Sequence, residues 1–273
     1  MPDPAALAER LVTVGGVVGV LLGGSRARGE HHPDSDVDLG VYYRPPLDVD
    51  GLSALAREVA GPSAAVTRPG DWGPWVDGGA WLRIDGVAVD WIYRDVDRVQ
   101  TAWRHAQEGR VAWQAQTGHP LGVLDVWYAG EVALGVVLAD PTGELTRLHT
   151  AAATFPEALA AALVARLSEA TFTLDIARKT IHRGDVAYVA GCIFRALGVC
   201  AYALHAAAGR WVVNEKGLIA TAGALPAAPA DFAARAHGLL ARVGGTPDEL
   251  AVTLDAAAAL VAEVVEGAVA HPP

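Results

Sequence analysis

The sequence predicts an α+β fold, in which a small mixed-sheet core is followed by an all-helical bundle. In the first third of the chain, short apolar runs of strand length alternate with helical segments. From about residue 96 onward, Ala-, Leu- and Val-rich segments with helical spacing dominate. Hydrophobic residues make up 52% of the 273 residues and charged residues 19%, which is enough apolar material for the cores of two domains. We place the boundary at residue 143, so that the domains span 1–143 and 144–273.

The core elements follow from apolar runs and from the Gly and Pro residues that end them. In order they are a helix at 4–13, strands at 17–22 and 37–43, a helix at 50–60, and a hairpin of two strands at 80–84 and 87–93. Gly23-Gly24 ends the first strand and Pro45-Pro46 the second. A Gly-, Pro- and Trp-rich loop at 69–79 precedes the hairpin, whose Asp85-Gly86 is a strong two-residue turn signal. This order is too short and too rich in hairpins for a doubly wound parallel sheet.

The remainder of the chain is predicted to be an irregular bridge and then a bundle. Residues 113–143 form the bridge, which ends in the turn Asp140-Pro141-Thr142-Gly143. The predicted bundle helices lie at 157–182, 185–208, 230–243 and 248–268. Short Gly and Pro breaks separate them, as in an antiparallel helical bundle.

One bundle segment is apolar enough to suggest a membrane span. Residues 186–204 carry a single charge, Arg195, and an arginine at mid-span costs about 2.5–3.5 kcal/mol. We therefore predict a buried central helix. Cys192 and Cys200 on it would lie about 12 Å apart, beyond the roughly 7 Å reach of a disulfide, so we expect buried, reduced thiols. Residues 1–4 lack the features of a signal peptide, and we expect a cytoplasmic protein without a membrane contact.

The charge balance limits the class of partner. With 21 basic and 31 acidic residues the formal charge is −10, which opposes an extended nucleic-acid interface. The same field would attract a cationic small molecule.

Acidic side chains on two predicted strands mark the candidate site. A strand ends in Gly-Gly-Ser, where the backbone can turn sharply and offer N–H groups to phosphate oxygens. Asp36 and Asp38 stand two residues apart, so period-two geometry places both carboxylates on one face, with Cα atoms about 7 Å apart. Asp90 is the lone charge in a later apolar strand. Burying such carboxylates without a cation is unfavourable, and Mg²⁺ with substrate phosphates suits them.

Three competing motifs fail in this stretch. Gly24 to Gly29 has the span of a P-loop, but Glu30 stands where lysine is required. Ser25 imitates a nucleophile elbow, but only 24 residues precede it, too few for the strands of a hydrolase. The alternating aspartates imitate a calcium loop, but Leu39 replaces its glycine and Pro45 its closing glutamate.

Weaker signals have a simpler structural explanation. His31 and His32 are expected to be exposed loop residues, and the arginines at 26 and 28 to be solvated, although either could contact a phosphate. Core packing is the favoured interpretation of Trp72, Trp75 and Trp81, with stacking on a base or sugar as the alternative.

Gly24-Ser25, Asp36-x-Asp38 and the later strand residue Asp90 together resemble the pattern of the polymerase-β-like nucleotidyltransferase superfamily. A helical domain after such a core resembles the antibiotic-modifying branch, such as the kanamycin, streptomycin and lincosamide nucleotidyltransferases. The motifs cover about residues 17–95, whereas the helical half matches in architecture and loosely at 211–217 (WVVNEKG).

The resemblance implies a reaction and roles for its residues. Asp36, Asp38 and Asp90 would be catalytic and would bind Mg²⁺, two ions in this family, with Asp90 a metal ligand, the proton acceptor, or both. The predicted nucleotide-binding residues are Gly24, Ser25, Arg28 and Lys216. The implied enzyme is a nucleotidyltransferase that moves AMP from ATP, or another NMP from its NTP, onto a hydroxyl of a small aminoglycoside-like or lincosamide-like antibiotic. It would confer antibiotic resistance, with the helical bundle on the acceptor side.

Two other classes stay open at this stage. The chain could be a toxin or regulator that nucleotidylates a protein or a tRNA, or a catalytically silent binding module. The missing basic face disfavours a tRNA, and the three carboxylates disfavour a silent module, because folding alone does not require them. Both a monomer and a homodimer fit the sequence.

Overall fold

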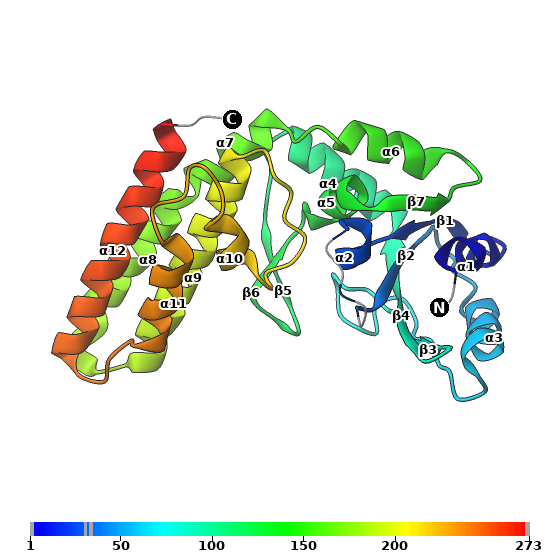
Figure 1. Ribbon diagram of the computed structural model, residues 1–273, viewed down its shortest axis with the longest axis horizontal. Coiled ribbons are helices and arrows are strands. Elements are labelled where there is room, and N and C mark those ends of the chain that lie inside the picture. Colours follow the sequence, from blue (N-terminus) through cyan, green and yellow to red (C-terminus); the bar gives the residue numbers. More distant parts are fainter. Residues whose placement is uncertain (1–2, 30–31, 33–34, 271–273) are drawn as a thin grey trace. The chain divides into compact units, whose positions relative to one another are not determined.

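The computed structural model describes residues 3–29, 32 and 35–270, and it confirms the predicted α+β class, with a mixed sheet followed by a helical region (Figure 1). By contacts the chain divides into two compact units, residues 1–105 with 112–154 and residues 106–111 with 155–273. The predicted boundary at residue 143 lies inside the first unit, because the helix that follows it packs there.

Within the described residues a five-stranded sheet organises the first unit, in the order β3-β4-β2-β1-β7. Its strands are β1 (Val17–Leu22), β2 (Val37–Tyr43), β3 (Gly79–Ile84), β4 (Val87–Asp95) and β7 (Val136–Ala139). β2 pairs with β4 in parallel, and the β1–β2, β1–β7 and β3–β4 pairs are antiparallel. The Asp85-Gly86 turn joins β3 to β4 as predicted, with Asp85 in the left-handed region at φ 49°. A mixed sheet thus places β2 and β4 side by side, although more than forty residues separate their starting points.

Helices cover both faces of this sheet. The helices of the first unit are α1 (Pro4–Leu11), α2 (Gly24–Ala27), α3 (Val49–Ala60), α4 (Val96–Gln107), α5 (Trp127–Leu134) and α6 (Glu144–Ala152). On one face, α1 and α3 bury Leu11 and Leu52 against Leu39 and Trp91 of the strands. On the other face, side chains of α4, α5 and α6 pack around Tyr42. Successive residues of β2 therefore point alternately into two different cores, as period-two geometry requires.

The predicted irregular bridge contains more regular structure than the sequence indicated. Besides α5 and β7, it holds the hairpin of β5 (Trp113–Gln116) and β6 (His119–Leu124). All three strands are short, and β7 pairs with β1, far away in sequence. Strand formation here depends on tertiary pairing, which local patterns do not report.

The second unit is a helical bundle. Its elements are α7 (Glu157–Ala165), α8 (Leu167–Thr180), the 3₁₀ turn η1 (Ile181–Arg183), α9 (Val186–Ala207), α10 (Leu218–Ala222), α11 (Phe232–Ala241) and α12 (Pro247–Ala270). The segment predicted as one helix at 157–182 is broken at Arg166 into α7 and α8. The Asp185 side chain accepts a hydrogen bond from the Tyr188 N–H and caps α9.

Among the described residues, α9 is the one helix that is by itself long and apolar enough to cross a membrane. Helix α6 together with the segment from α7 to η1 meets the same criterion only as a pair bent by 58°. Helices α7, α8, α10, α11 and α12 all pack against α9, and 61% of its apolar window is buried. This is the environment of a central bundle helix. Cys192 and Cys200 are buried, free thiols on it, as predicted.

Candidate active site

The turn after β1 is shaped around the backbone and side chain of Asp38. The Gly23 N–H donates to the Asp38 carbonyl oxygen at 2.8 Å. Gly24 has a φ of +63°, in the left-handed region that favours glycine. A Cβ built at Gly24 would lie 2.8 Å from the carboxyl carbon of Asp38 and nearer still to one of its oxygens. The Asp38 carboxylate therefore lies against Gly24, in space that only glycine leaves open.

The short helix α2 begins at this turn, where the sequence predicted only a sharp bend. Its first intrahelical hydrogen bond runs from the Ala27 N–H to the Gly23 carbonyl at 3.2 Å. The N–H groups of Gly24, Ser25 and Arg26 precede this bond and are not used by the helix itself. Of these residues, Gly24 lies against the Asp38 carboxylate, and phosphate binding at this turn stays a prediction.

Parallel pairing brings Asp38 and Asp90 together. In the β2–β4 register Asp38 is the direct partner of Asp90, so their Cα atoms are separated by about one strand spacing, roughly 4.8 Å. Both side chains point to the face that carries Tyr42, because Leu39 and Trp91 point into the opposite core. Asp36, two residues before Asp38, is exposed at the start of the strand. The structure thus places Asp38 and Asp90 side by side on the sheet, with Asp36 near enough for its charge to raise the pKa of both.

Electrostatics show how closely these acids interact. The pKa of Asp90 is raised to about 6, mainly by burial and then by the negative charges of Asp38 and Asp36. Burial also raises the pKa of Asp38, with Asp36 and then Glu131 adding repulsion and Arg28 opposing it. Raised carboxyl pKa values mark a site where negative charge is poorly compensated by the protein alone.

Arg26 holds the loop before β2 in place. Its Nε donates to the Ser35 and Asp36 carbonyl oxygens at 3.2 and 3.0 Å, and its Nη2 to Ser35 at 2.6 Å. This arginine ties α2 to the start of β2 rather than lying solvated as predicted. Arg28, the predicted phosphate contact, lowers the pKa of Asp38, and Arg26 does so to a smaller extent; the contact of Arg28 with a phosphate stays a prediction.

A buried ion pair lies on the same face of the sheet. Arg94 of β4 and Glu131 of α5 form a bidentate pair with N–O distances of 2.5 and 2.7 Å, and the Arg94 guanidinium lies 5.1 Å from the centre of the Tyr128 ring. Glu131 also acts on the pKa of Asp38. Sequence reasoning missed this residue, although it is the lone charge in an apolar helix, the same signal that singled out Asp90.

Trp81 differs from its predicted core position. It is 71% exposed and is the direct partner of Asp90 in the antiparallel β3–β4 pair. Trp72 is half-buried and stacks on it, with ring centroids 4.2 Å apart and an angle of 14° between the planes. Trp75 is half-buried and packs on Tyr128 instead. Of the three tryptophans, only Trp81 combines high exposure with a place beside an acidic residue of the site.

The remaining predicted residues lie elsewhere or outside the described chain. Lys216 belongs to the second unit, just before α10, and its N–H donates to the Asn214 side chain at 2.9 Å, so its contact with a nucleotide stays a prediction. His32 is exposed, and its N–H donates to Ser35 Oγ. The prediction for His31 falls outside the described residues.

The donor set fits a hard divalent cation. The oxygens of Asp36, Asp38 and Asp90 are the ligands that Mg²⁺ prefers, with substrate phosphates completing its shell. A cation would also remove the mutual repulsion that raises the pKa values of Asp38 and Asp90. Within the described part of the chain, no group of three or more His, Cys, Asp or Glu side chains is already arranged as a metal site. Metal binding by the aspartates therefore stays a prediction.

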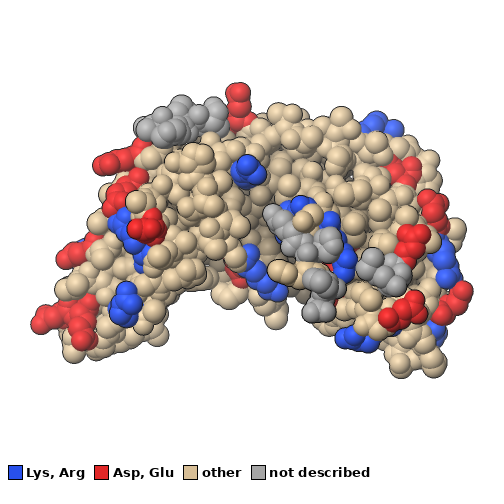
Figure 2. Space-filling view, viewed as in Figure 1, with Lys and Arg blue, Asp and Glu red and all other residues tan. Residues whose placement is uncertain are grey.

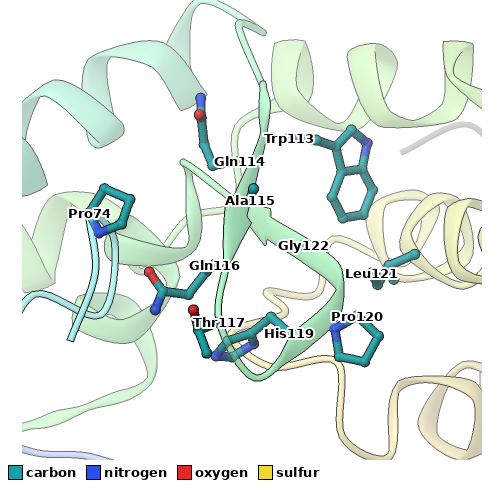
Figure 3. Close-up of a pocket in the computed structure, with 10 residues that line it drawn as sticks. All are labelled: Pro74, Trp113, Gln114, Ala115, Gln116, Thr117, His119, Pro120, Leu121 and Gly122. Carbon is teal, nitrogen blue, oxygen red and sulfur yellow. The ribbon is translucent and has the colours of Figure 1, made fainter.

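A separate cavity of about 450 Å³ lies at the β5–β6 hairpin. Figure 3 shows Gln116 pointing to the side on which Pro74 lies, and Trp113 and Leu121 on the other side. Gln116 holds the Trp-rich loop in place, because its side chain accepts from the Trp75 and Val76 N–H groups at 3.1 and 3.2 Å. None of the three aspartates lines this cavity.

Surface charge agrees with the composition. On the face shown in Figure 2, acidic and basic side chains of the described residues are interspersed rather than gathered into one basic surface. The exclusion of an extended nucleic-acid interface stays a prediction from the net charge of −10.

Comparison with known proteins bears on the N-terminal part of the chain, which carries the turn after β1 and strand β2. Residues 5–62 match the family model described as "Nucleotidyltransferase domain". This is a nucleotidyltransferase domain match. It spans β1, α2 and β2, and so includes Gly24, Ser25, Asp36 and Asp38, but it ends before Asp90. Nucleotidyltransferase domains generally use a nucleoside triphosphate and a divalent metal.

Other comparisons add little. No curated protein matches the chain. Among solved structures, the crystal structure of a nucleotidyltransferase-like protein from Exiguobacterium sibiricum 255-15 is similar at 14% identity and a TM-score of 0.48, over 97% of this chain and 76% of that chain. We base no conclusion on a likeness this distant.

Proposed function

We propose that the chain transfers a nucleoside monophosphate, AMP from ATP in the first instance, onto a hydroxyl group of a small molecule in a Mg²⁺-dependent reaction. The observation that carries this proposal is the direct pairing of Asp38 with Asp90 on adjacent parallel strands, with Gly24 against the Asp38 carboxylate. Folding alone gives no reason to set two half-buried carboxylates side by side. The match of residues 5–62 to a nucleotidyltransferase domain supports the same reaction class.

Each group has a distinct task in this proposal. Asp36 and Asp38 would hold the metal, which would neutralise the triphosphate and polarise the α-phosphoryl group. The N–H groups of Gly24 and Ser25 and the Ser25 hydroxyl bind the β- and γ-phosphates. Arg28 adds a positive charge near Asp38. These contacts position the α-phosphorus and compensate its charge, which supplies most of the catalysis in phosphoryl-group transfer.

The bond changes follow from this placement. The acceptor oxygen forms a bond to the α-phosphorus while the bond from the α-phosphorus to the bridging oxygen breaks, and pyrophosphate leaves with that electron pair. The acceptor proton passes to Asp90 or to solvent. With a pKa near 6, Asp90 is ionised at neutral pH and can accept a proton. Asp90 acts as the base, as a metal ligand, or as both.

For the acceptor we propose a cationic, hydroxylated antibiotic of the aminoglycoside or lincosamide type, which would make the protein a resistance enzyme. Its support is the acidic balance of the chain, whose formal net charge of −10 attracts a cationic molecule. We further propose that the protein acts in the cytoplasm.

The test is pyrophosphate release with each NTP and Mg²⁺, across a panel of aminoglycosides, lincosamides and cell extract. Asp38→Asn should reduce release at least 100-fold. The matched control is Asp85→Asn in the exposed β3–β4 turn, where asparagine also tolerates the left-handed conformation; it should retain the wild-type rate. Release that persists in Asp38→Asn would place the chemistry elsewhere. Acceleration by extract but by no antibiotic would instead favour a protein or tRNA acceptor.

A further inference from the structure

Trp81 presents its indole to solvent beside the candidate catalytic acids. It is 71% exposed, although tryptophan is among the side chains with most to gain from burial. Directly opposed residues of an antiparallel pair project from the same face of the sheet. Trp81 and Asp90 are such a pair, so the indole lies on the face that carries Asp38 and Asp90.

The exposed indole is held in place from behind. Trp72 stacks on it nearly parallel, with ring centroids 4.2 Å apart. The backbone leaves room for this stack, because a Cβ added at Gly79 would lie 3.0 Å from the Trp72 ring. Two hydrogen bonds fix the loop that carries Trp72: the N–H groups of Trp72 and Gly70 donate to the Asp77 carbonyl oxygen, at 3.1 and 2.9 Å. Trp81 is thus a supported platform with one indole face covered by Trp72.

The order of the strands shows which part of the reaction this platform faces. Across the sheet the sequence is β1, β2, β4, β3, which places the Gly24–Ser25 turn, Asp38, Asp90 and Trp81 in a row at spacings of about 4.8 Å. In phosphoryl-group transfer the attacking and leaving oxygens lie roughly in line through the phosphorus. If pyrophosphate leaves on the side of the Gly24–Ser25 turn, the acceptor arrives on the opposite side, past Asp90, where Trp81 lies.

We infer that Trp81, supported by Trp72, is the acceptor platform of this site, and that its ligand is a hydroxylated ring bearing an amine. This inference rests on the proposed nucleotidyl transfer. The C–H face of a saturated ring packs on an indole, and an ammonium group gains a cation–π contact with it of about 0.5–2 kcal/mol. A neutral ring would gain only the first of these contacts.

The test measures binding without turnover. Dissociation constants of kanamycin, lincomycin and ATP with Mg²⁺ are measured by calorimetry for the wild type, Trp81→Ala and Trp81→Phe. Phe172→Ala is the control, since it removes another exposed aromatic side chain, 64% exposed, from α8. Trp81→Ala should weaken the antibiotic that binds the wild type at least 10-fold, Trp81→Phe should weaken it less, and ATP affinity should stay within twofold. Phe172→Ala should leave all three constants unchanged.

Three outcomes would overturn the inference. Unchanged antibiotic affinity in Trp81→Ala would remove the platform from the acceptor site. A 10-fold loss of ATP affinity instead would show that the indole binds the nucleobase. Failure of both antibiotics to bind the wild type would refute the aminated-ring acceptor. In that last case, Mg²⁺-dependent pyrophosphate release that is lost in Asp38→Asn would still uphold nucleotidyl transfer, so the two failures are distinguishable.

Discussion

Replacing Gly24 with alanine tests whether the turn after β1 positions Asp38. The added Cβ would lie 2.8 Å from the Asp38 carboxyl carbon, whereas carbon atoms in normal contact are about 3.5 Å or more apart. The carboxylate must therefore retreat by about 1 Å, and a misplacement of that size costs on the order of 100-fold in rate. The left-handed φ of +63° at this position adds about 1–2 kcal/mol of backbone strain for alanine.

A second glycine in the same loop separates these two effects. Gly29 also has a left-handed φ, +70°, but a Cβ there meets no atom of the described residues within 4 Å. Gly24→Ala and Gly29→Ala should therefore lose similar stability in urea unfolding. Only Gly24→Ala should lose about 100-fold in kcat for pyrophosphate release. Equal rates in the two variants would refute the role of Gly24 in placing Asp38.

Two further perturbations address the charges of the site. Glu131→Gln leaves the buried Arg94 without its anionic partner, so urea unfolding should show a free energy of unfolding lower by about 3 kcal/mol. The control Glu58→Gln, in an exposed ion pair, should lower it by less than about 1 kcal/mol. Similar losses in the two variants would contradict the role of the buried pair. Because the folded-state pKa of Asp90 is raised to about 6, metal-free protein is stabilised by this group below about pH 4 and loses that stabilisation as pH rises through 6. Asp90→Asn should then be more stable than the wild type at pH 7.5 by about 1 kcal/mol, a value discounted for its half-exposed position, and no more stable at pH 4. A constant difference across this pH range would contradict the shift.

How far the sequence predicted the site depends on the kind of signal. Asp36, Asp38 and Asp90 stood out because charge interrupts apolar strands, and Gly24 because a turn must follow a strand there. The sequence alone could not show that Asp38 and Asp90 are direct partners, since strand register is set by tertiary pairing. The exposure of Trp81 was mispredicted for the same reason. A tryptophan in an alternating strand is assigned to a face only once the neighbours of that strand are known.

The same difference between local signals and tertiary pairing decided which elements of the fold were predicted. Elements with a strong local period or a defined turn, such as α3 and the β3–β4 hairpin, were predicted within a few residues. The hairpin of β5 and β6 was missed because its strands are short and Pro120 interrupts one of them. The break between α7 and α8 at Arg166 was missed because neither glycine nor proline, the usual signals of a helix end, stands there.

The most direct test is Mn²⁺ binding, measured by electron paramagnetic resonance in the presence of a nonhydrolysable ATP analogue. The central claim is that Asp36, Asp38 and Asp90 hold a shared divalent metal. Single replacement of each by asparagine should weaken Mn²⁺ binding at least 10-fold, while Asp85→Asn should bind as the wild type does. Wild-type affinity in the Asp90→Asn and Asp38→Asn variants would contradict a metal shared between β2 and β4.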